Sequence, residues 1–409
     1  MPPGGPPLTD RWTLAVCATR IFLFANFMTV AAVMPILLKE WQISGAEAGA
    51  IVTAFTLSYA ASLFAFAWAA DHIGAKRAVA ISAVASAVAS AAFGLFARDW
   101  ASAVLLYGLV GLSQGGVYTP LIMLFAERNA PLRRGTAMGW LIASTSLGYA
   151  GSLLLSGVAL SFGGYRTAFL VTGFAPALGA VLLLSCLRGI ENRVHPRKAH
   201  GGLWHHVFGG RDARLLTTGY TAHCWELLGS WAWLPSLIAA AFALGGSSIA
   251  VASQWSALTT GCMHLAGATA SFVMGALSDR LGRRAVLLGV AAAGAALSLA
   301  IGWVIWLPAS VFVALALVYT LLTIGDSPVL TTAITEVTDP ARLGAVLAVR
   351  SLLGFGAGAI APLAAGLAFD ATTSMAWPAP VVWGLTFTVL GIGGVIATLC
   401  AARLSRRAR

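Results

Sequence analysis

Long apolar runs separated by short polar segments make up most of the chain. An α-helix needs about 20 predominantly apolar residues to cross the hydrocarbon core of a bilayer. Twelve runs of roughly this length or longer occur, near residues 12–38, 46–70, 76–97, 101–126, 135–162, 166–187, 213–242, 248–276, 284–306, 309–336, 344–369 and 380–402. The pattern predicts an all-α membrane protein with twelve transmembrane helices.

One polar segment between two apolar runs, residues 275–284, has a second copy earlier in the chain. Its acidic, glycine and basic positions recur at an offset of 208 residues: Asp279, Gly282 and Arg284 follow Asp71, Gly74 and Lys76. An Asp at a helix end can accept hydrogen bonds from a neighbouring helix, Gly permits a tight reversal, and basic side chains anchor to lipid phosphates. For either copy alone, a basic turn that only sets the topology is the alternative.

Two copies at one offset indicate that the chain consists of two related halves. We place the N-terminal six-helix half at residues 1–187 and the C-terminal six-helix half at residues 213–409. The basic segment 188–212 falls between them, and we expect it to be a cytoplasmic linker. Parallel repeats of this kind are typical of several transporter folds.

Composition excludes the soluble globular classes. The 409 residues are 59% hydrophobic and 10% charged, whereas about 25% of residues in soluble domains are charged. The five cysteines all fall in apolar runs, with an odd count and no Cys-x-x-Cys pair. We therefore expect free thiols and neither a disulfide framework nor a zinc site.

The position of the basic residues explains the net charge of +11. If both termini lie in the cytoplasm, most Lys and Arg fall on that side, and the opposite face holds only Lys39, Arg98 and Arg166. This asymmetry follows the positive-inside rule and predicts cytoplasmic termini. The lipid bilayer then accounts for the charge without a nucleic-acid partner. We expect a multi-pass monomer in a bacterial-type inner (plasma) membrane.

The second polar segment resembles a known signature. Residues 275–284 are similar to the Gly-x-Leu-x-Asp-Arg-x-Gly-Arg-Arg sequence between the second and third helices of each half in the major facilitator superfamily. The resemblance covers the whole chain and implies a secondary transporter that works by alternating access. In that family the signature latches the cytoplasmic side while the protein faces outward. The resemblance assigns this gating role to Asp279, Arg280, Gly282, Arg283 and Arg284.

The first copy departs from the signature. Ala67, His72 and Ala75 stand where the signature has Gly, Arg and Arg. The residues that keep the pattern are Asp71, Gly74 and Lys76. The resemblance therefore implies a weaker latch in the N-terminal half.

Polar and ionisable side chains inside the predicted spans are few. Each ionisable group deep in a bilayer costs at least ~2.5 kcal/mol, so its placement is a functional clue. The predicted helices carry Arg20, Asn26, His223, Glu226, His264, Asp326 and Arg350. The third, sixth, ninth and twelfth predicted helices carry no ionisable group in their interiors. The resemblance implies that those four helices face lipid and that the others line a central cavity.

Three of these residues are candidates for proton coupling. His223 and Glu226 are separated by i,i+3, so they share one face of a helix and can share a proton. Asp326 reaches a similar depth, about mid-bilayer. An inert polar pair that fixes helix packing is the alternative.

Arg20 and Arg350 lie nearer the cytoplasmic ends of their helices. One or both can offer a planar, two-donor clamp for a carboxylate or similar anion. Two alternatives remain open at this point: the long side chains can snorkel to the interface, or they can neutralise Glu226 and Asp326. The other expected substrate contacts are Asn26, Tyr118, Trp225 and His264.

The favoured function is proton-coupled uptake of a small organic anion, with no cofactor. The chain has no phosphate-binding loop, nucleophile elbow or His-Glu-x-x-His motif, so we expect no enzyme activity. A soft metal ion such as Cu(I) is an alternative cargo, with His223, Cys224, Met263 and His264 as candidate ligands. Efflux of a lipophilic compound and a non-transporting membrane sensor are the remaining alternatives.

Overall fold

The apolar runs of the sequence fold into helices in the computed structural model, which describes residues 11–128, 131–194, 210–338 and 343–405. The helices are α1 (Arg11–Leu23), α2 (Thr29–Glu40), α3 (Gly45–Ile73), α4 (Ala75–Phe96), α5 (Trp100–Gln114), α6 (Thr119–Arg128), α7 (Pro131–Leu187), α9 (Arg211–Leu244), α10 (Ile249–Leu281), α11 (Arg283–Ile301), α12 (Ala309–Val337), α13 (Leu343–Ser374) and α14 (Ala379–Arg403). Short 3₁₀ turns, η1 (Gly115–Val117) and η2 (Gly302–Val304), follow α5 and α11. No strand occurs in these ranges, so the predicted all-α class is confirmed.

The boundaries differ from the predicted spans at three places. The first predicted span is divided into α1 and α2, and the fourth is divided into α5, η1 and α6. The fifth and sixth spans run together as α7, whose backbone departs from helical geometry only at Gly163 and Gly164. Elsewhere the ends follow local caps, such as the capping boxes of Ser44 with Glu47 before α3 and of Asp99 with Ser102 before α5.

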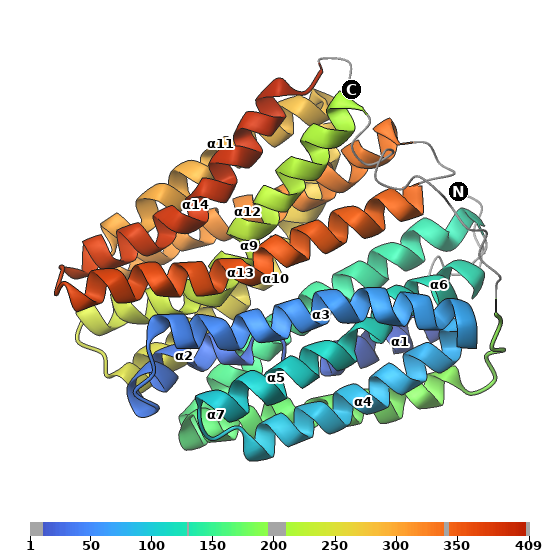
Figure 1. The fold of residues 1–409 in the computed structure, drawn as a ribbon, viewed down its shortest axis with the longest axis horizontal. Helices are drawn as coiled ribbons and strands as arrows, with labels where there is room; N and C mark the ends of the chain where they lie inside the picture. Colours follow the sequence, from blue (N-terminus) through green and yellow to red (C-terminus); the bar gives the residue numbers. More distant parts are fainter. Residues whose placement is uncertain (1–10, 129–130, 195–209, 339–342, 406–409) are drawn as a thin grey trace, which may run out of the picture.

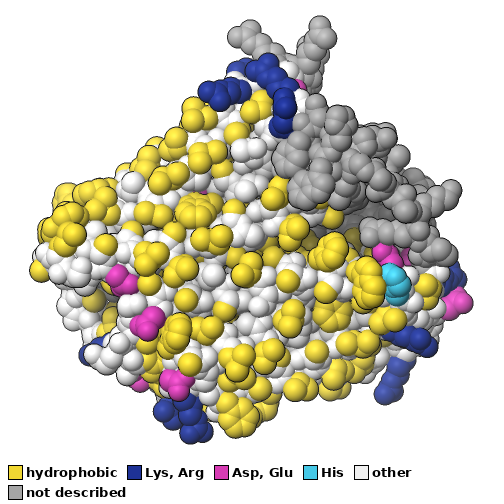
Figure 2. All heavy atoms as spheres, in the orientation of Figure 1, with side chains coloured by type: hydrophobic (Ala, Val, Ile, Leu, Met, Phe, Trp, Pro, Cys, Tyr) yellow, Lys and Arg dark blue, Asp and Glu magenta, His cyan; other side chains and the backbone are white. Residues whose placement is uncertain are grey.

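Nine helices within the described ranges are long and apolar enough to cross a membrane. They are α3, α4, Trp100–Phe125, Ala143–Leu187, α9, Arg283–Val304, α12, Val346–Ser374 and α14. Large apolar side chains are exposed on the surface, including Phe64, Phe162 and Phe272, whose exposed fractions are 67%, 81% and 80%. Figure 2 shows one face covered largely by hydrophobic side chains, with charged groups mostly toward its edges. Such a surface fits contact with lipid, and the count of twelve spans stays a prediction.

The helices pack as two groups (Figure 1). In the N-terminal group, α1 to α7, helices α1 and α4 pack against α7, and α3 packs against α5. In the C-terminal group, α9 to α14, helix α9 packs against α13 and α14. The groups meet where α3 contacts α13 and where α7 contacts α10. Residues 195–209, most of the predicted linker, lie outside the described residues, and the boundaries of the halves stay a prediction.

The two groups touch most closely at the end of the molecule opposite the two termini (Figure 1). There the Asp370 carboxylate on α13 accepts hydrogen bonds from the first amides of α3: Gly45 N at 2.6 Å and Ala46 N at 2.8 Å. A Cβ on Gly49 would lie 2.3 Å from the Pro362 carbonyl oxygen, so the two backbones are in near contact. From this end, α3 and α13 diverge toward the end where the termini lie (Figure 1).

Candidate substrate and proton sites

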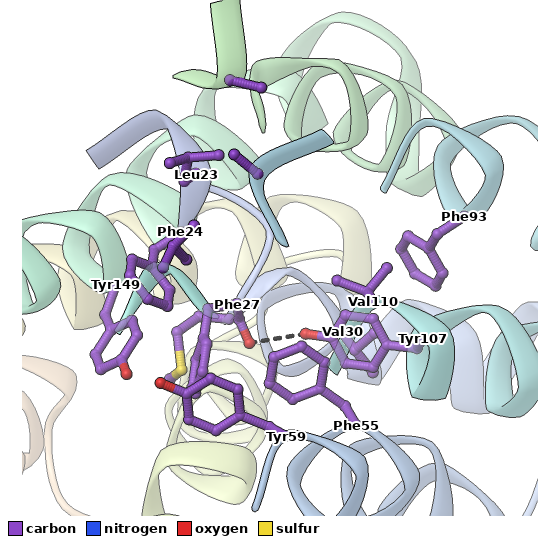
Figure 3. Packing of buried hydrophobic residues seen from close by; sticks show 14 of the residues in the cluster. Leu23, Phe24, Phe27, Val30, Phe55, Tyr59, Phe93, Tyr107, Val110 and Tyr149 are labelled. Carbon is purple, nitrogen blue, oxygen red and sulfur yellow. Dashed lines mark hydrogen bonds between the residues drawn. The ribbon is translucent and has the colours of Figure 1, made fainter. Parts of the chain in front are cut away.

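The interruption between α1 and α2 is held by polar side chains of neighbouring helices. The Tyr107 hydroxyl donates to the carbonyl oxygens of Asn26 and Phe27, with distances of 3.0 and 2.7 Å. Figure 3 shows this hydroxyl directed at the Phe27 carbonyl. Gln114 Nε2 donates to the Leu23 carbonyl at 3.1 Å. Hydrocarbon offers no partner to a free backbone group, so these bonds allow a break inside the bundle.

Asn26 is part of the same polar network. Its Nδ2 donates to Ser90 Oγ at 2.5 Å, and its Oδ1 accepts from Gln114 Nε2 at 2.9 Å. The residue is fully buried within the N-terminal group. The structure therefore places Asn26, an expected substrate contact, in a role that supports the break.

Arg20 lies on α1, just before the break, and is fully buried. Its Nη1 donates to Ser144 Oγ at 3.0 Å and to the Leu141 carbonyl. Its Nε and Nη2 have no hydrogen-bond partner among the described residues. The guanidinium carbon is 5.2 Å from the centre of the Phe24 ring and 5.6 Å from that of Tyr118. These aromatic faces provide favourable but partial compensation for a buried cation.

Arg350 on α13 is in a similar position in the C-terminal group. It is 3% exposed, and its guanidinium carbon is 3.5 Å from the centre of the Tyr220 ring. Its Nη2 donates to Thr331 Oγ1 at 3.2 Å, and its Nε has no partner in the described part of the chain. Tyr118 is close enough to act electrostatically on both arginines, so one tyrosine links the two groups at this level.

Neither arginine forms an ion pair with an acidic side chain in the described ranges. Both are buried, so neither guanidinium lies on the surface as snorkelling requires. Desolvating a cation without a paired anion costs several kcal/mol. The arrangement is therefore suited to an anion supplied from outside the chain, with free N–H donors already in place.

The acidic residues of the C-terminal group pair differently from the sequence expectation. His223 Nδ1 is 3.0 Å from Asp326 Oδ1, and His223 Nε2 is 2.8 Å from Ser327 Oγ. His223 therefore pairs with Asp326 and not with Glu226, the partner expected from the i,i+3 spacing. Residues three apart in a helix differ in direction by about 300°, which is about 60° the other way round. This angle lets the side chains of His223 and Glu226 face different neighbours.

Glu226 points into the C-terminal group. Its carboxylate lies near the hydroxyls of Ser298 and Tyr319, which bond to each other at 3.0 Å, and its Oε1 has no hydrogen-bond partner among the described residues. Gly394 on α14 leaves room for the carboxylate, since a Cβ there would lie 2.4 Å from Glu226 Oε2. Asp326 is close enough to act electrostatically on Glu226. Glu226, Asp326 and His223 thus form one buried titratable cluster.

The remaining expected contacts are divided between two regions. Tyr118 lies beside Arg20, and the His264 ring lies 5.2 Å from the Trp231 ring. Trp225 instead faces α14, where its Nε1 donates to the Val389 carbonyl at 2.9 Å. The structure therefore commits the Trp225 donor to α14.

The four candidate ligands for a soft metal ion do not converge. His223 is bound to Asp326 and Ser327, and Met263 Sδ accepts from Thr320 Oγ1 at 3.9 Å. Within the described ranges, no group of three or more His, Cys, Asp or Glu side chains could hold a metal ion. The geometry lends no support to this alternative.

The two polar segments occupy equivalent turns. Gly74 joins α3 to α4 with φ of 90°, and Gly282 joins α10 to α11 with φ of 88°, a region that favours glycine. Lys76 Nζ donates to the Ile190 carbonyl at 2.7 Å. The contacts that are seen for Lys76 therefore stay within the N-terminal group and the start of the linker.

The second segment also makes contacts within its own helix group. Arg283 bridges Asp279 at 2.5 Å and Glu336 at 3.0 Å. Arg284 Nη2 donates to the Ala402 carbonyl at 2.8 Å, and Arg280 lies exposed at the end of α10. These bonds tie α10, α11, α12 and α14 together, and the latch role of Asp279 stays a prediction.

Several residues of these sites were not predicted. Tyr107 and Ser152 support the break, and Ser298 and Tyr319 lie near Glu226. Uncharged residues of these types are common in membrane helices, so the sequence contains no signal that separates them. Asp370, near the end of a span, resembled an ordinary interfacial charge.

Comparison with known proteins agrees with the fold. A family model described as Major Facilitator Superfamily matches residues 16–260. A bacterial homolog of the human lysosomal transporter Spinster, in an inward-facing and occupied conformation, superposes with a TM-score of 0.72 at 16% identity, covering 98% of this chain and 96% of that one. A D-xylose-proton symporter superposes with a TM-score of 0.76 at 14% identity, covering 98% and 99%. At these identities the likeness shows the fold alone.

Two curated relatives are transporters of organic solutes by name. A probable sulfoacetate transporter of Cupriavidus necator is 25% identical over 288 residues, which are 66% of this chain and 64% of the relative. A probable 4-methylmuconolactone transporter of Cupriavidus pinatubonensis is 24% identical over 266 residues, 62% of this chain and 59% of the relative. The matches thus span less than two thirds of either relative. With a helical membrane fold, a family match over more than half its length and these relatives, the chain belongs to the Major Facilitator Superfamily of membrane transporters.

Proposed function

We propose that this transporter takes up a small organic anion together with protons, by alternating access, across a bacterial-type inner membrane. The observation that carries the proposal is the pair of buried arginines, Arg20 and Arg350, which have unpaired N–H donors and a common neighbour in Tyr118. A planar guanidinium with free donors binds a carboxylate, sulfonate or phosphate in two-point fashion. Two of the relatives are named for sulfoacetate and hexose phosphate, both anions, which supports the same class.

The orientation in the membrane follows from the charge asymmetry. With both termini in the cytoplasm, the contact of Asp370 with the start of α3 closes the external side. The divergence of α3 and α13 toward the termini then corresponds to an inward-facing state (Figure 1). In this state an anion bound between the arginines can leave to the cytoplasm, as uptake requires.

Proton coupling is assigned to the cluster of His223, Asp326 and Glu226. Asp326 acts electrostatically on Arg350 without an ion-pair contact between them, so the cation and the carboxylate stabilise each other's charge. An anion bound at Arg350 neutralises that cation and makes proton binding to the His223–Asp326 pair more favourable. Anion and proton binding therefore support each other, which is the requirement for symport.

The test is uptake into proteoliposomes that contain the purified full chain. The probes are radiolabelled sulfoacetate as the anion and D-xylose as an uncharged control, and a trapped pH dye reports the protons. We expect sulfoacetate to enter only when the outside is more acidic, with acidification of the lumen, and Arg20→Gln to abolish its entry. Uptake that is independent of the proton gradient, or uptake of D-xylose alone, would contradict the proposal. Metal analysis of the same preparation tests the soft-ion alternative, and an absence of any flux would favour a sensor.

A further inference from the structure

Two buried groups of opposite charge lie near each other in the C-terminal group without forming an ion pair. Arg350 on α13 is 3% exposed, and Asp326 on α12 is 5% exposed. Asp326 acts electrostatically on Arg350, yet Arg350 Nε and Asp326 Oδ1 each lack a hydrogen-bond partner among the described residues. Charges buried in a membrane protein usually pair with one another, because contact offsets part of the cost of desolvating both. A feature of the structure therefore keeps these two side chains apart.

The Tyr220 ring on α9 lies beside Arg350 and near the partner of Asp326. Helix α9 packs against both α12 and α13. The centre of the Tyr220 ring is 3.5 Å from the Arg350 guanidinium carbon and 6.1 Å from the centre of the His223 ring. His223 Nδ1 in turn lies 3.0 Å from Asp326 Oδ1. The aromatic ring therefore covers a face of the cation on the side of the helix that carries His223.

Helix α13 has room for this ring at Gly354. Gly354 follows Arg350 by four residues, so the two lie on one face of the helix. A Cβ on Gly354 would lie 2.5 Å from Tyr220 Cε1 and 2.9 Å from Tyr220 Cδ1. At its edge the guanidinium is held by Thr331, whose Oγ1 accepts from Arg350 Nη2 at 3.2 Å. Thr331 lies five residues beyond Asp326, about 7.5 Å along α12. The ring and the hydroxyl thus hold Arg350 away from Asp326.

The other ionisable groups around this pair lie on α9 and in the N-terminal group. They are His223 and Glu226, which are near Asp326, and Cys224, Tyr118 and Tyr149, which act on Arg350 or on Tyr220. Thiols and phenols carry no charge near neutral pH. Asp326 is therefore the carboxylate that would capture Arg350 if the ring were absent.

We infer that Tyr220 is a positioning residue: its ring keeps Arg350 from pairing with Asp326, so that the cation stays available to an anion and the carboxylate to a proton. The inference rests on the proposed anion and proton sites and adds the residue that keeps them separate. A direct ion pair would satisfy both charges internally and would oppose binding of the anion and of the proton. The ring stabilises the cation without neutralising it.

A double-mutant cycle tests the spacing without any ligand. Arg350→Gln and Asp326→Asn are combined in the otherwise unsubstituted protein and in Tyr220→Ala, and the melting temperature of the purified full chain in detergent is measured. We expect a small coupling in the first background, because no ion pair joins the two side chains. In Tyr220→Ala the freed guanidinium pairs with Asp326, so the coupling should be at least twofold larger. An equal coupling in the two backgrounds would overturn the inference.

Calorimetric binding of sulfoacetate tests the consequence for the anion. We expect Tyr220→Ala to weaken binding at least tenfold. Adding Asp326→Asn to Tyr220→Ala should recover most of the affinity, because an amide does not capture the guanidinium. Tyr220→Phe retains the ring and should bind nearly as tightly as the unsubstituted protein. The matched control is Tyr165→Ala, which truncates a tyrosine that bonds to Trp41 and should leave binding unchanged. A loss in Tyr220→Ala that Asp326→Asn does not recover would show a merely structural role and overturn the inference.

The outcomes also distinguish this inference from the proposed function. If the unsubstituted protein does not bind sulfoacetate, the result counts against the proposed function, while the ligand-free cycle still decides whether Tyr220 separates the charges. Unweakened binding in Tyr220→Ala would overturn the role of Tyr220 and retain the anion site. If Tyr220→Ala does not remain folded in size-exclusion chromatography, Tyr220→Leu provides both comparisons, since leucine lacks the aromatic face that holds the guanidinium.

Discussion

At the scale of single residues, the molecule is defined by charges that are buried without full compensation. Arg20 and Arg350 retain free donors, and Glu226 retains a free carboxylate oxygen among the described residues. His223 Nδ1 lies 3.0 Å from Asp326 Oδ1, but this oxygen also lacks a hydrogen bond of good geometry among the described residues. A buried charge without full compensation is expensive, so a bound anion at the arginines and a proton at the carboxylates would each lower this cost.

Arg350→Lys tests whether the planar guanidinium is needed. The side chain stacks 3.5 Å from the Tyr220 ring centre and donates to Thr331. Lysine retains the charge but loses the planar stacking and the two-point fork. We expect binding of sulfoacetate, measured by calorimetry, to weaken tenfold or more, about 1.4 kcal/mol. A loss below about threefold would indicate that charge alone is sufficient, and exposed Arg188→Lys is the control.

Asp326→Asn tests the proton site. The substitution removes the titratable carboxylate that pairs with His223 and retains a similar shape. We expect uptake driven by a proton gradient to fall at least tenfold, while exchange of labelled for unlabelled anion continues, because only the proton step is lost. Ser327→Ala, which removes the other partner of His223, should have a smaller effect on gradient-driven uptake. Equal loss of exchange and of driven uptake in Asp326→Asn would argue for a structural role.

At the scale of elements, the important feature is a helix that stops and restarts within the bundle. The carbonyl oxygens freed between α1 and α2 are bonded by Tyr107 and Gln114, and the Met28 amide donates to Ser152 Oγ at 2.9 Å. The interruption leaves Arg20 on α1 and brings the Phe27 ring to 4.1 Å from the Tyr149 ring, centre to centre. Irregular backbone at membrane depth is tolerated where protein surrounds it, which holds here.

Tyr107→Phe tests the support of this break. The change removes one hydroxyl that serves two buried carbonyl oxygens, so these lose a donor that lipid cannot replace. We expect destabilisation of about 1–3 kcal/mol, seen as a lower melting temperature of the purified protein in detergent. Tyr165→Phe removes one acceptor from the part-buried Trp41 indole and should lower the melting temperature less. Equal melting temperatures for Tyr107→Phe and the unsubstituted protein would show that the break needs no such donor.

At the scale of the whole molecule, the two helix groups close on each other at one end only. Asp370 accepts from the amides of Gly45 and Ala46, at the positive end of the α3 dipole. Small residues, including Gly49 and Gly366, bring the two backbones together there. Alternating access requires these contacts to break and others to form at the opposite end.

Asp370→Asn should shift the molecule toward the state that is open at this end. Hydrogen bonds to a charged group contribute about 1.5–3 kcal/mol, so the population ratio should change about tenfold or more. Distances between spin labels on the loops after α2 and after α13, in a cysteine-free background, report the change. The matched control is Glu47→Gln, which affects the capping box of Ser44 without bridging the groups. An unchanged distance distribution in Asp370→Asn would show that close packing alone holds this end.

The sequence alone determined the class of molecule and many of its polar residues. Apolar runs long enough to span a bilayer must become helices, since no other open structure satisfies its backbone in lipid. Charged residues within such runs are rare because they are costly, so Arg20, Arg350, Glu226 and Asp326 could be identified without coordinates. The repeated segment with Gly74 and Gly282 indicated equivalent turns, and both have the positive φ that glycine allows.

Only the tertiary structure decided which of these residues meet. The i,i+3 spacing suggested that His223 pairs with Glu226, but α12 presents Asp326 to His223, while α11 and α12 present hydroxyls to Glu226. Trp225 and Trp231 look alike in sequence, yet Trp225 donates to α14, whereas the Trp231 donor is buried without a partner among the described residues. The break near Phe27 has no proline or glycine within it, because its stability comes from Tyr107, Gln114 and Ser152 on other helices. Periodicity and composition indicate the free-energy cost of burying a residue in the membrane. The partners that the residue meets depend on helix rotation and packing, which no single segment encodes.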